Sequence, residues 1–134
     1  MTNHELFLDS SALFAFVDRD EKSGVTVATY LEEAKRPLIT TDLIFAESLS
    51  LITKRLGKKV GIETGLKLRS SEFARVITLD EAIRDEAWNL YQKYRDKDFD
   101  FIDATSFIFC RRRKIQEVLT LDRHFQQMGF SVVP

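Results

Sequence analysis

The sequence predicts an α/β fold, a three-layer α/β/α sandwich built around a parallel sheet. Five short apolar runs have the length of strands, and longer segments with helical periodicity alternate with them. The sequence contains no internal repeat, no low-complexity tract and no linker rich in Pro, Gly or Ser. We therefore expect residues 1–134 to form a single domain with one substantial core.

The expected strands are rich in Val, Ile, Leu and Phe, which suit strands that are buried on both faces. Because a helical segment separates most consecutive runs, neighbouring strands are expected to run parallel. In chain order the strands are ELFL at 5–8, PLIT at 37–40, RVITL at 75–79, EVLTL at 117–121 and FSVV at 130–133.

The clearest expected helix begins at Asp80, a good N-cap residue, and then repeats apolar side chains along one face. A second helix is expected over 41–56, where TTD opens the segment and Gly57 closes it. The other helices are expected near 24–35, 59–70, 101–113 and 122–128.

Composition and charge limit the classes of function. The hydrophobic fraction of 44% and the charged fraction of 31% are typical of a globular protein. There are 20 Lys and Arg against 21 Asp and Glu, a formal net charge of -1. This balance argues against bulk attraction to nucleic acid or to an anionic membrane, although it is compatible with a local basic patch.

The sequence favours a cytoplasmic location. Cys110 is the only cysteine, so an intrachain disulfide is impossible and a reducing compartment fits. The first residues, MTNHELFLDSSALFAF, make a poor signal peptide because they lack a basic leader and contain Asp9. No apolar run approaches the roughly 18 residues that a membrane span needs.

Four acidic residues mark the expected ligand-binding edge, which in α/β sheets lies beyond the carboxyl ends of the strands. Asp9 follows the run ELFL and Asp122 follows EVLTL, so both should point into the same rim. Glu47 lies on the helix 41–56 among mostly apolar neighbours, less than two turns from its start. Asp103 stands near the start of another helix, in an otherwise apolar segment.

Each of these acids also has a structural explanation. Asp9 and Asp122 could cap the helices that follow them. Asp103 could be the third helical residue after an Asp100 N-cap, where a carboxylate is favourable. Glu47 could reach solvent or pair with a lysine. For two further acids that follow strands, helix capping is the preferred interpretation: Asp42 and Asp80.

Taken together, the four acids favour a metal site. Carboxylates that converge on one cleft repel one another and raise their pKa values unless a cation is present. Oxygen-rich sites without sulfur suit hard cations such as Mg²⁺ or Mn²⁺. Two such ions about 4 Å apart can hold the attacking and leaving oxygens of phosphoryl transfer.

Other chemistries have weaker support. His4 and His124 are the only histidines, and neither has a zinc-ligand spacing with Cys110. The serines of DSSAL lack a G-x-S-x-G elbow, and there is no P-loop and no G-x-G-x-x-G motif. His124, in LDRHF, is expected to be a surface or packing residue.

Basic residues form two clusters, for which solvated helix ends are the simpler interpretation. The first is KRLGKK at 54–59 with Lys67 and Arg69, and the second is RRRK at 111–114. The second lies a full helix away from Asp103, so the first is the better candidate for holding phosphates beside the acids.

Four segments carry a resemblance to a known family: FLDSSAL, AES, FIDA and LTLDRHF, in this order. They resemble the four motifs of PIN-domain ribonucleases, in particular the VapC toxins of toxin–antitoxin pairs, and the likeness extends from Leu6 to Val133. It implies a PIN-like five-stranded parallel sheet in the order 3-2-1-4-5. It also implies Mg²⁺-dependent endoribonuclease activity that leaves a 5′-phosphate and a 3′-hydroxyl, with Mn²⁺ as an alternative ion.

The resemblance assigns the catalytic and metal-binding roles to Asp9, Glu47, Asp103 and Asp122. Asp9 and Asp103 would be the principal ligands of the first Mg²⁺, while the other two would hold a second ion or orient the attacking water. Ser10 matches a small hydroxyl residue that hydrogen-bonds in the site. In DKDFDFIDA we choose Asp103 because FIDA opens a helix, and Asp100 is then its cap.

The implied function is the toxin of a type II toxin–antitoxin system, with RNA as substrate, a small antitoxin as partner and a homodimeric state. One alternative is a PIN enzyme of RNA processing without an antitoxin. A phospho-acceptor receiver domain would need a lysine after its last strand, but the chain ends in SVVP. A haloacid dehalogenase-type hydrolase would need an aspartate where Ser11 stands.

Overall fold

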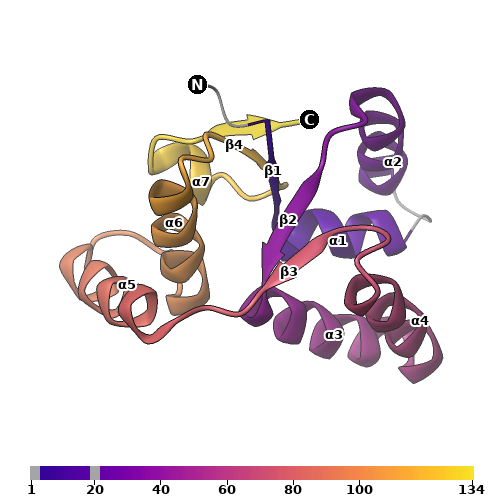
Figure 1. Cartoon of the computed structure of the whole chain (residues 1–134), viewed down its shortest axis with the longest axis horizontal. Helices are drawn as coiled ribbons and strands as arrows, with labels where there is room; N and C mark the ends of the chain where they lie inside the picture. Colours follow the sequence, from indigo (N-terminus) through magenta and orange to yellow (C-terminus); the bar gives the residue numbers. More distant parts are fainter. Residues whose placement is uncertain (1–3, 19–21) are drawn as a thin grey trace.

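The computed structural model describes residues 4–18 and 22–134 and contains a five-stranded parallel sheet with helices around it (Figure 1). The strand order is β3-β2-β1-β4-β5, as the family resemblance implied, so β1 and β4 lie side by side. Four of the strands are shorter than the apolar runs that predicted them, whereas β2 has the predicted length and begins one residue later. They are β1 Leu6–Leu8, β2 Leu38–Thr41, β3 Arg75–Ile77, β4 Glu117–Leu119 and β5 Ser131–Val133.

The helices occupy the predicted segments, with one addition. α1 follows β1 directly, where the sequence suggested a helix only through the capping alternative for Asp9. α7 is shorter than the expected 122–128. The helices are α1 Ser10–Val17, α2 Lys22–Ala34, α3 Asp42–Leu56, α4 Lys58–Arg69, α5 Glu81–Lys93, α6 Phe101–Arg113 and α7 His124–Gln127.

Two hydrophobic clusters cover the two faces of the sheet, which confirms the three-layer prediction. In β1, Leu6 and Leu8 belong to the cluster with α1, α2 and α4, while Phe7 belongs to the cluster with α5, α6 and α7. All three side chains are 0% exposed, because successive strand residues point to opposite faces and both faces are covered.

Helix capping followed the prediction at one strand end and not at the other. The Asp80 carboxylate accepts a hydrogen bond from the backbone N–H of Ile83 and caps α5, as expected. The prediction for Asp42 is wrong, because the hydroxyl of Thr41 caps α3. The carboxylate of Asp42 instead accepts the N–H of Leu79 at 3.0 Å and pairs with Arg84 at 3.3 Å.

α6 is the central helix of its layer and is buried along most of its length. Every residue from Ala104 to Cys110 is buried, and Phe107 packs edge-on against Phe125 with ring centroids 5.0 Å apart. The N-terminal end of α6 therefore carries Asp103 to the carboxyl edge of the sheet while the rest of the helix anchors it in the core. No helix within the described ranges is long and apolar enough to cross a membrane.

Candidate functional site

Asp9 directly follows β1 and is the most deeply buried acid of the site, with 3% of its surface exposed. It occupies the N-cap position of α1, but its side chain makes no capping hydrogen bond. Its carboxylate instead accepts hydrogen bonds from the hydroxyls of Thr120, at 2.7 Å, and Ser11, at 3.0 Å. Burial raises the pKa of Asp9, and these hydrogen bonds lower it. Capping therefore does not explain this residue.

Ser11 and Thr120 join the end of β1 to the loop that carries Asp122. The hydroxyl of Ser11 accepts the backbone N–H of Leu121 at 3.0 Å, and that of Thr120 accepts the N–H of Asp122 at 2.9 Å. β4 ends at Leu119, so this loop separates Asp122 from the strand. The sequence assigned neither hydroxyl to the site. In the sequence, only their positions within two residues of Asp9 and Asp122 indicated that they could belong to the site.

Asp103 and Asp100 form a reciprocal capping box at the start of α6. The carboxylate of Asp100 accepts the N–H of Asp103 at 2.8 Å, and Oδ2 of Asp103 accepts the N–H of Asp100 at 3.1 Å. The capping alternative for Asp103 is therefore correct. It does not compete with metal binding, because a carboxylate has a second oxygen and each oxygen has two lone pairs.

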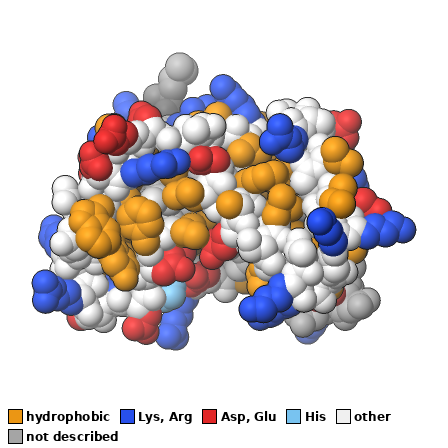
Figure 2. All heavy atoms as spheres, turned by 90° about the horizontal axis from the view of Figure 1, so that it is seen from below, with side chains coloured by type: hydrophobic (Ala, Val, Ile, Leu, Met, Phe, Trp, Pro, Cys, Tyr) orange, Lys and Arg blue, Asp and Glu red, His pale blue; other side chains and the backbone are white. Residues whose placement is uncertain are grey.

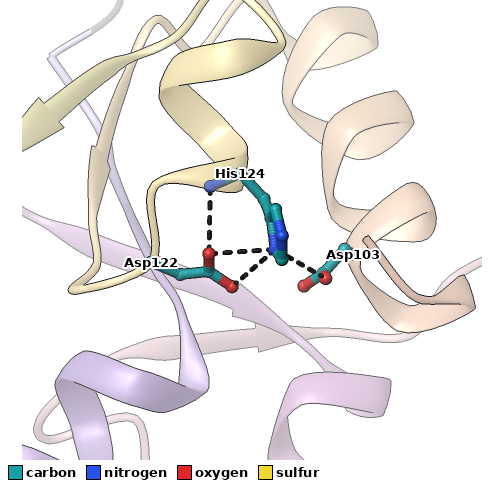
Figure 3. A group of neighbouring side chains, drawn as sticks. All are labelled: Asp103, Asp122 and His124. Atoms are coloured by element: carbon teal, nitrogen blue, oxygen red, sulfur yellow. Dashed lines mark hydrogen bonds and ion pairs between the residues drawn. The ribbon is translucent and has the colours of Figure 1, made fainter. Parts of the chain in front are cut away.

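Asp122 and His124 lie together opposite Asp103 (Figure 3). Oδ1 of Asp122 accepts the backbone N–H of His124 at 2.9 Å, but the N-cap position of α7 is taken by Arg123, so Asp122 is not the cap that the alternative proposed. Nδ1 of His124 is 2.9 Å from Oδ1 of Asp122 and 3.7 Å from Oδ2 of Asp103. His124, which was expected to be a surface or packing residue, thus lies among the acids of the candidate site.

Glu47 is half-buried on α3 and faces the same group of acids. Burial is the main cause that raises its pKa, and the charges of Asp100, Asp9 and Asp122 raise it further. A hydrogen bond with Ser10 lowers it, in agreement with the hydrogen bond expected for Ser10. Within the described ranges no lysine pairs with Glu47, so the ion-pair alternative has no support.

The electrostatics of the four acids favour a bound cation. Burial, together with the charges of Asp100, Asp9 and Asp122, raises the pKa of Asp103 from 3.8 to about 8, although the hydrogen bond from the backbone of Asp100 lowers it. Carboxylates that destabilise one another in this way are stabilised by a cation between them. Their oxygen donors fit a hard divalent ion. Ligand atoms of Asp103, Asp122 and His124 also lie within 4.8 Å of one another. The site can hold a divalent cation.

Figure 2 shows the surface of the molecule from below, the side toward which β2 runs in Figure 1. Acidic side chains gather beside a histidine, and hydrophobic side chains flank them. The three arginines of the second basic cluster contact a carbonyl or carboxylates away from the four acids: Arg111 with Met128, Arg112 with Glu86, and Arg113 with Glu5. The first basic cluster, on α3 and α4, remains the candidate for phosphate contacts.

Thr120→Val is expected to weaken binding of Mn²⁺ by about tenfold, because a partner that orients a ligand typically contributes 10–100-fold in affinity. The change removes the hydroxyl that donates to Asp9 and keeps the side-chain shape. Titration calorimetry would measure the affinity. Thr64→Val is the matched control, since the hydroxyl of Thr64 bonds the Val60 carbonyl within α4. Equal affinity of Thr120→Val and wild type would contradict this role.

Residues 6–131 match the PIN domain family model. The chain belongs to the PIN domain family. Two curated relatives come from Mycobacterium tuberculosis: the 23S rRNA-specific endonuclease VapC20, 26% identical over 96% of this chain and 97% of the relative, and the ribonuclease VapC26, 24% identical over 96% and 100%. The resemblance to VapC-type PIN ribonucleases is thus confirmed, and the receiver and dehalogenase alternatives have no support.

Solved structures agree on the fold. The crystal structure of Mycobacterium tuberculosis VapC20, described as a sarcin-ricin loop cleaving toxin, aligns with a TM-score of 0.87 at 22% identity, over 93% of this chain and 95% of that one. The structure of FitAcB from Neisseria gonorrhoeae aligns with a TM-score of 0.65 at 17% identity, over 96% of both chains.

Proposed function

We propose that this PIN domain is a Mg²⁺-dependent endoribonuclease and the toxin of a type II toxin–antitoxin pair. The observation that carries the proposal is the convergence of four acids at the carboxyl edge of the sheet, where the charges of Asp9 and Asp122 raise the pKa values of Glu47 and Asp103. The named activities of VapC20 and VapC26, which match over nearly their whole length, support it. We further propose that residues 1–134 form a single domain.

The proposed catalytic and metal-binding residues are those that the family motifs marked. Asp9 and Asp103 would hold the first Mg²⁺, and Glu47 and Asp122 would complete the site. A bound Mg²⁺ would supply positive charge for the phosphoryl transition state and lower the pKa of a coordinated water. Mn²⁺ has the same preference for oxygen ligands and could replace it.

The surrounding residues support these roles by holding the acids in place before any substrate binds. Hydroxyls of Ser11 and Thr120 fix the carboxylate of Asp9, and the backbone N–H of Asp100 fixes that of Asp103. A binding site whose ligands are already oriented loses less entropy when it binds. The buried aromatic contacts of α6 and α7 add rigidity behind the site.

RNA would be held by the basic cluster of α3 and α4, which comprises 54–59 with Lys67 and Arg69. Arg55 lies over the ring of Phe14 at 5.5 Å, on the α1 side of the site. Contacts of such residues with phosphates position the RNA chain without reading its sequence. The other proposed partners are a small antitoxin and a second copy of this chain.

Purified protein incubated with total RNA is expected to release discrete fragments with Mg²⁺ and none with EDTA. The products should carry 5′-phosphate and 3′-hydroxyl ends, which ligation-based end mapping distinguishes from the products of metal-free ribonucleases. Equal cleavage in EDTA would contradict the metal-dependent mechanism, and no cleavage of any RNA under both conditions would contradict the nuclease assignment.

Millimolar Mn²⁺ or Mg²⁺ is expected to raise the melting temperature, since an ion present at 100 times its Kd adds about 2.7 kcal/mol to the free energy of unfolding. The gain should shrink in Asp9→Ala, which removes a ligand. Asp80→Ala is the control, because it removes the α5 cap but no member of the cluster. It should lower the melting temperature and keep the gain from Mn²⁺. An unchanged wild-type melting curve would overturn the metal site.

A further inference from the structure

His124 is held with its ring against the acids by the core behind it. It is the first residue of α7, and the next residue, Phe125, is 0% exposed and packs against Phe7 and Phe107. The backbone N–H of His124 donates to Asp122 at 2.9 Å, which fixes the start of the helix. Only 20% of the His124 side chain is exposed. The direction of the ring is thus set by the fold.

The ring nitrogen lies where a metal ligand would lie. Nδ1 is 2.9 Å and 3.1 Å from the two oxygens of Asp122 and 3.7 Å from Oδ2 of Asp103 (Figure 3). Donor atoms at about 2.1 Å from one ion are about 3 Å apart when they occupy neighbouring positions. The observed separations therefore suit one ion with the two carboxylates and the imidazole around it.

We infer that His124 is a nitrogen ligand of the second divalent cation, which binds between Asp122 and Asp103. This inference rests on the proposed metal-dependent function and changes its ligand set, because the family motifs marked acids alone. Nδ1 now faces Asp122 at hydrogen-bond distance, and as a ligand it would offer its lone pair to the ion while Nε2 carries the proton.

An imidazole ligand changes the preference of the site for its ion. Mg²⁺ prefers oxygen ligands and dehydrates reluctantly, whereas first-row transition metals accept imidazole more readily. His124→Gln is therefore expected to raise the Kd for Mn²⁺ at this position by about tenfold. This is the low end of the 10–100-fold loss of metal affinity seen when residues that orient metal ligands are mutated. The Kd for Mg²⁺ should change less.

The alternative is that His124 only orients Asp122 and never touches the ion. Pulsed electron paramagnetic resonance separates the two, since ¹⁴N modulation of the Mn²⁺ echo arises from a directly coordinated nitrogen. Untagged protein is saturated with Mn²⁺ and measured as wild type, His124→Gln and His4→Gln. His4 is the matched control, because it is the only other histidine and lies exposed before β1, at the opposite end of that strand.

The expected result is ¹⁴N modulation in wild type and His4→Gln and none in His124→Gln. Labelling the histidines with ¹⁵N should replace the ¹⁴N signal in wild type, so the assignment holds even where His124→Gln fails to fold. Bound Mn²⁺ without nitrogen modulation in wild type, or modulation that persists in folded His124→Gln, would overturn the inference and leave the proposed nuclease intact.

Other outcomes distinguish the two proposals. If the wild type binds no Mn²⁺, both the inference and the metal-dependent mechanism fail. If nitrogen modulation is present but the loaded protein cleaves no RNA, the ligand assignment stands and the proposed function fails.

Discussion

Asp103→Asn is expected to lower RNA cleavage by about 100-fold or more while leaving the fold intact. Residues that only hydrogen-bond to a metal ligand already contribute about 10–100-fold to activity, and a ligand itself should contribute at least as much. The amide oxygen can still accept the N–H of Asp100, so the capping box should survive. The neutral amide is, however, a much weaker ligand for a divalent cation than the carboxylate. Cleavage of a labelled RNA by purified variants would measure the effect.

The matched control is Asp98→Asn, which neutralises an exposed acid of the same segment outside the cluster. It should cleave at the wild-type rate. If Asp103→Asn folds, as judged by circular dichroism, and cleaves as fast as wild type, Asp103 is not a member of the catalytic site.

The same variant has an expected pH signature without metal. The pKa of Asp103 rises from 3.8 to about 8 on folding, so between these values the folded protein binds more protons than the unfolded chain. The contribution of Asp103 to stability is therefore fully present below about pH 4 and is lost as the pH rises through about 8. Denaturation in EDTA should show this decline in wild type and a shallower one in Asp103→Asn.

Expression of the chain alone is expected to stop or strongly slow the growth of its host, and co-expression of the proposed antitoxin should restore growth. A free endoribonuclease destroys RNA, whereas an antitoxin that covers the acids would block the substrate. An arginine of the antitoxin could pair with these carboxylates in place of metal. Colony counts and co-purification of the two proteins measure both parts.

Asp103→Asn again provides the control, because its expression should be harmless while the complex still forms. A protein that cleaves RNA, is harmless in excess and has no co-purifying antitoxin would favour the RNA-processing alternative. A partner helix could meet the half-buried rim residues Phe14, Leu43 and Phe45. Leu43 and Phe45 also pack against the core clusters.

Local patterns in the sequence were enough to predict the three layers of the fold and the positions of Asp9 and Asp80 at strand ends. Leu6, Phe7 and Leu8 are all apolar although successive strand residues point to opposite faces of the sheet. Both faces must therefore be covered, and the structure confirms this. An acid that directly follows such a run must lie at the carboxyl edge, which placed Asp9. The N-cap at Asp80 was equally predictable, because its partner is only three residues away.

The tertiary structure decided every contact between distant segments. Asp42 bonds Leu79 and Arg84 rather than its own helix, and Thr120 bonds Asp9 across 111 positions of sequence. These pairs exist because β2 lies beside β3 and β1 beside β4. Strand order also decided that the ring of His124 meets Asp103. Periodicity and caps depend on neighbours along the chain, whereas burial, repulsion between carboxylates and hydrogen bonds across strands depend on which segments pack together.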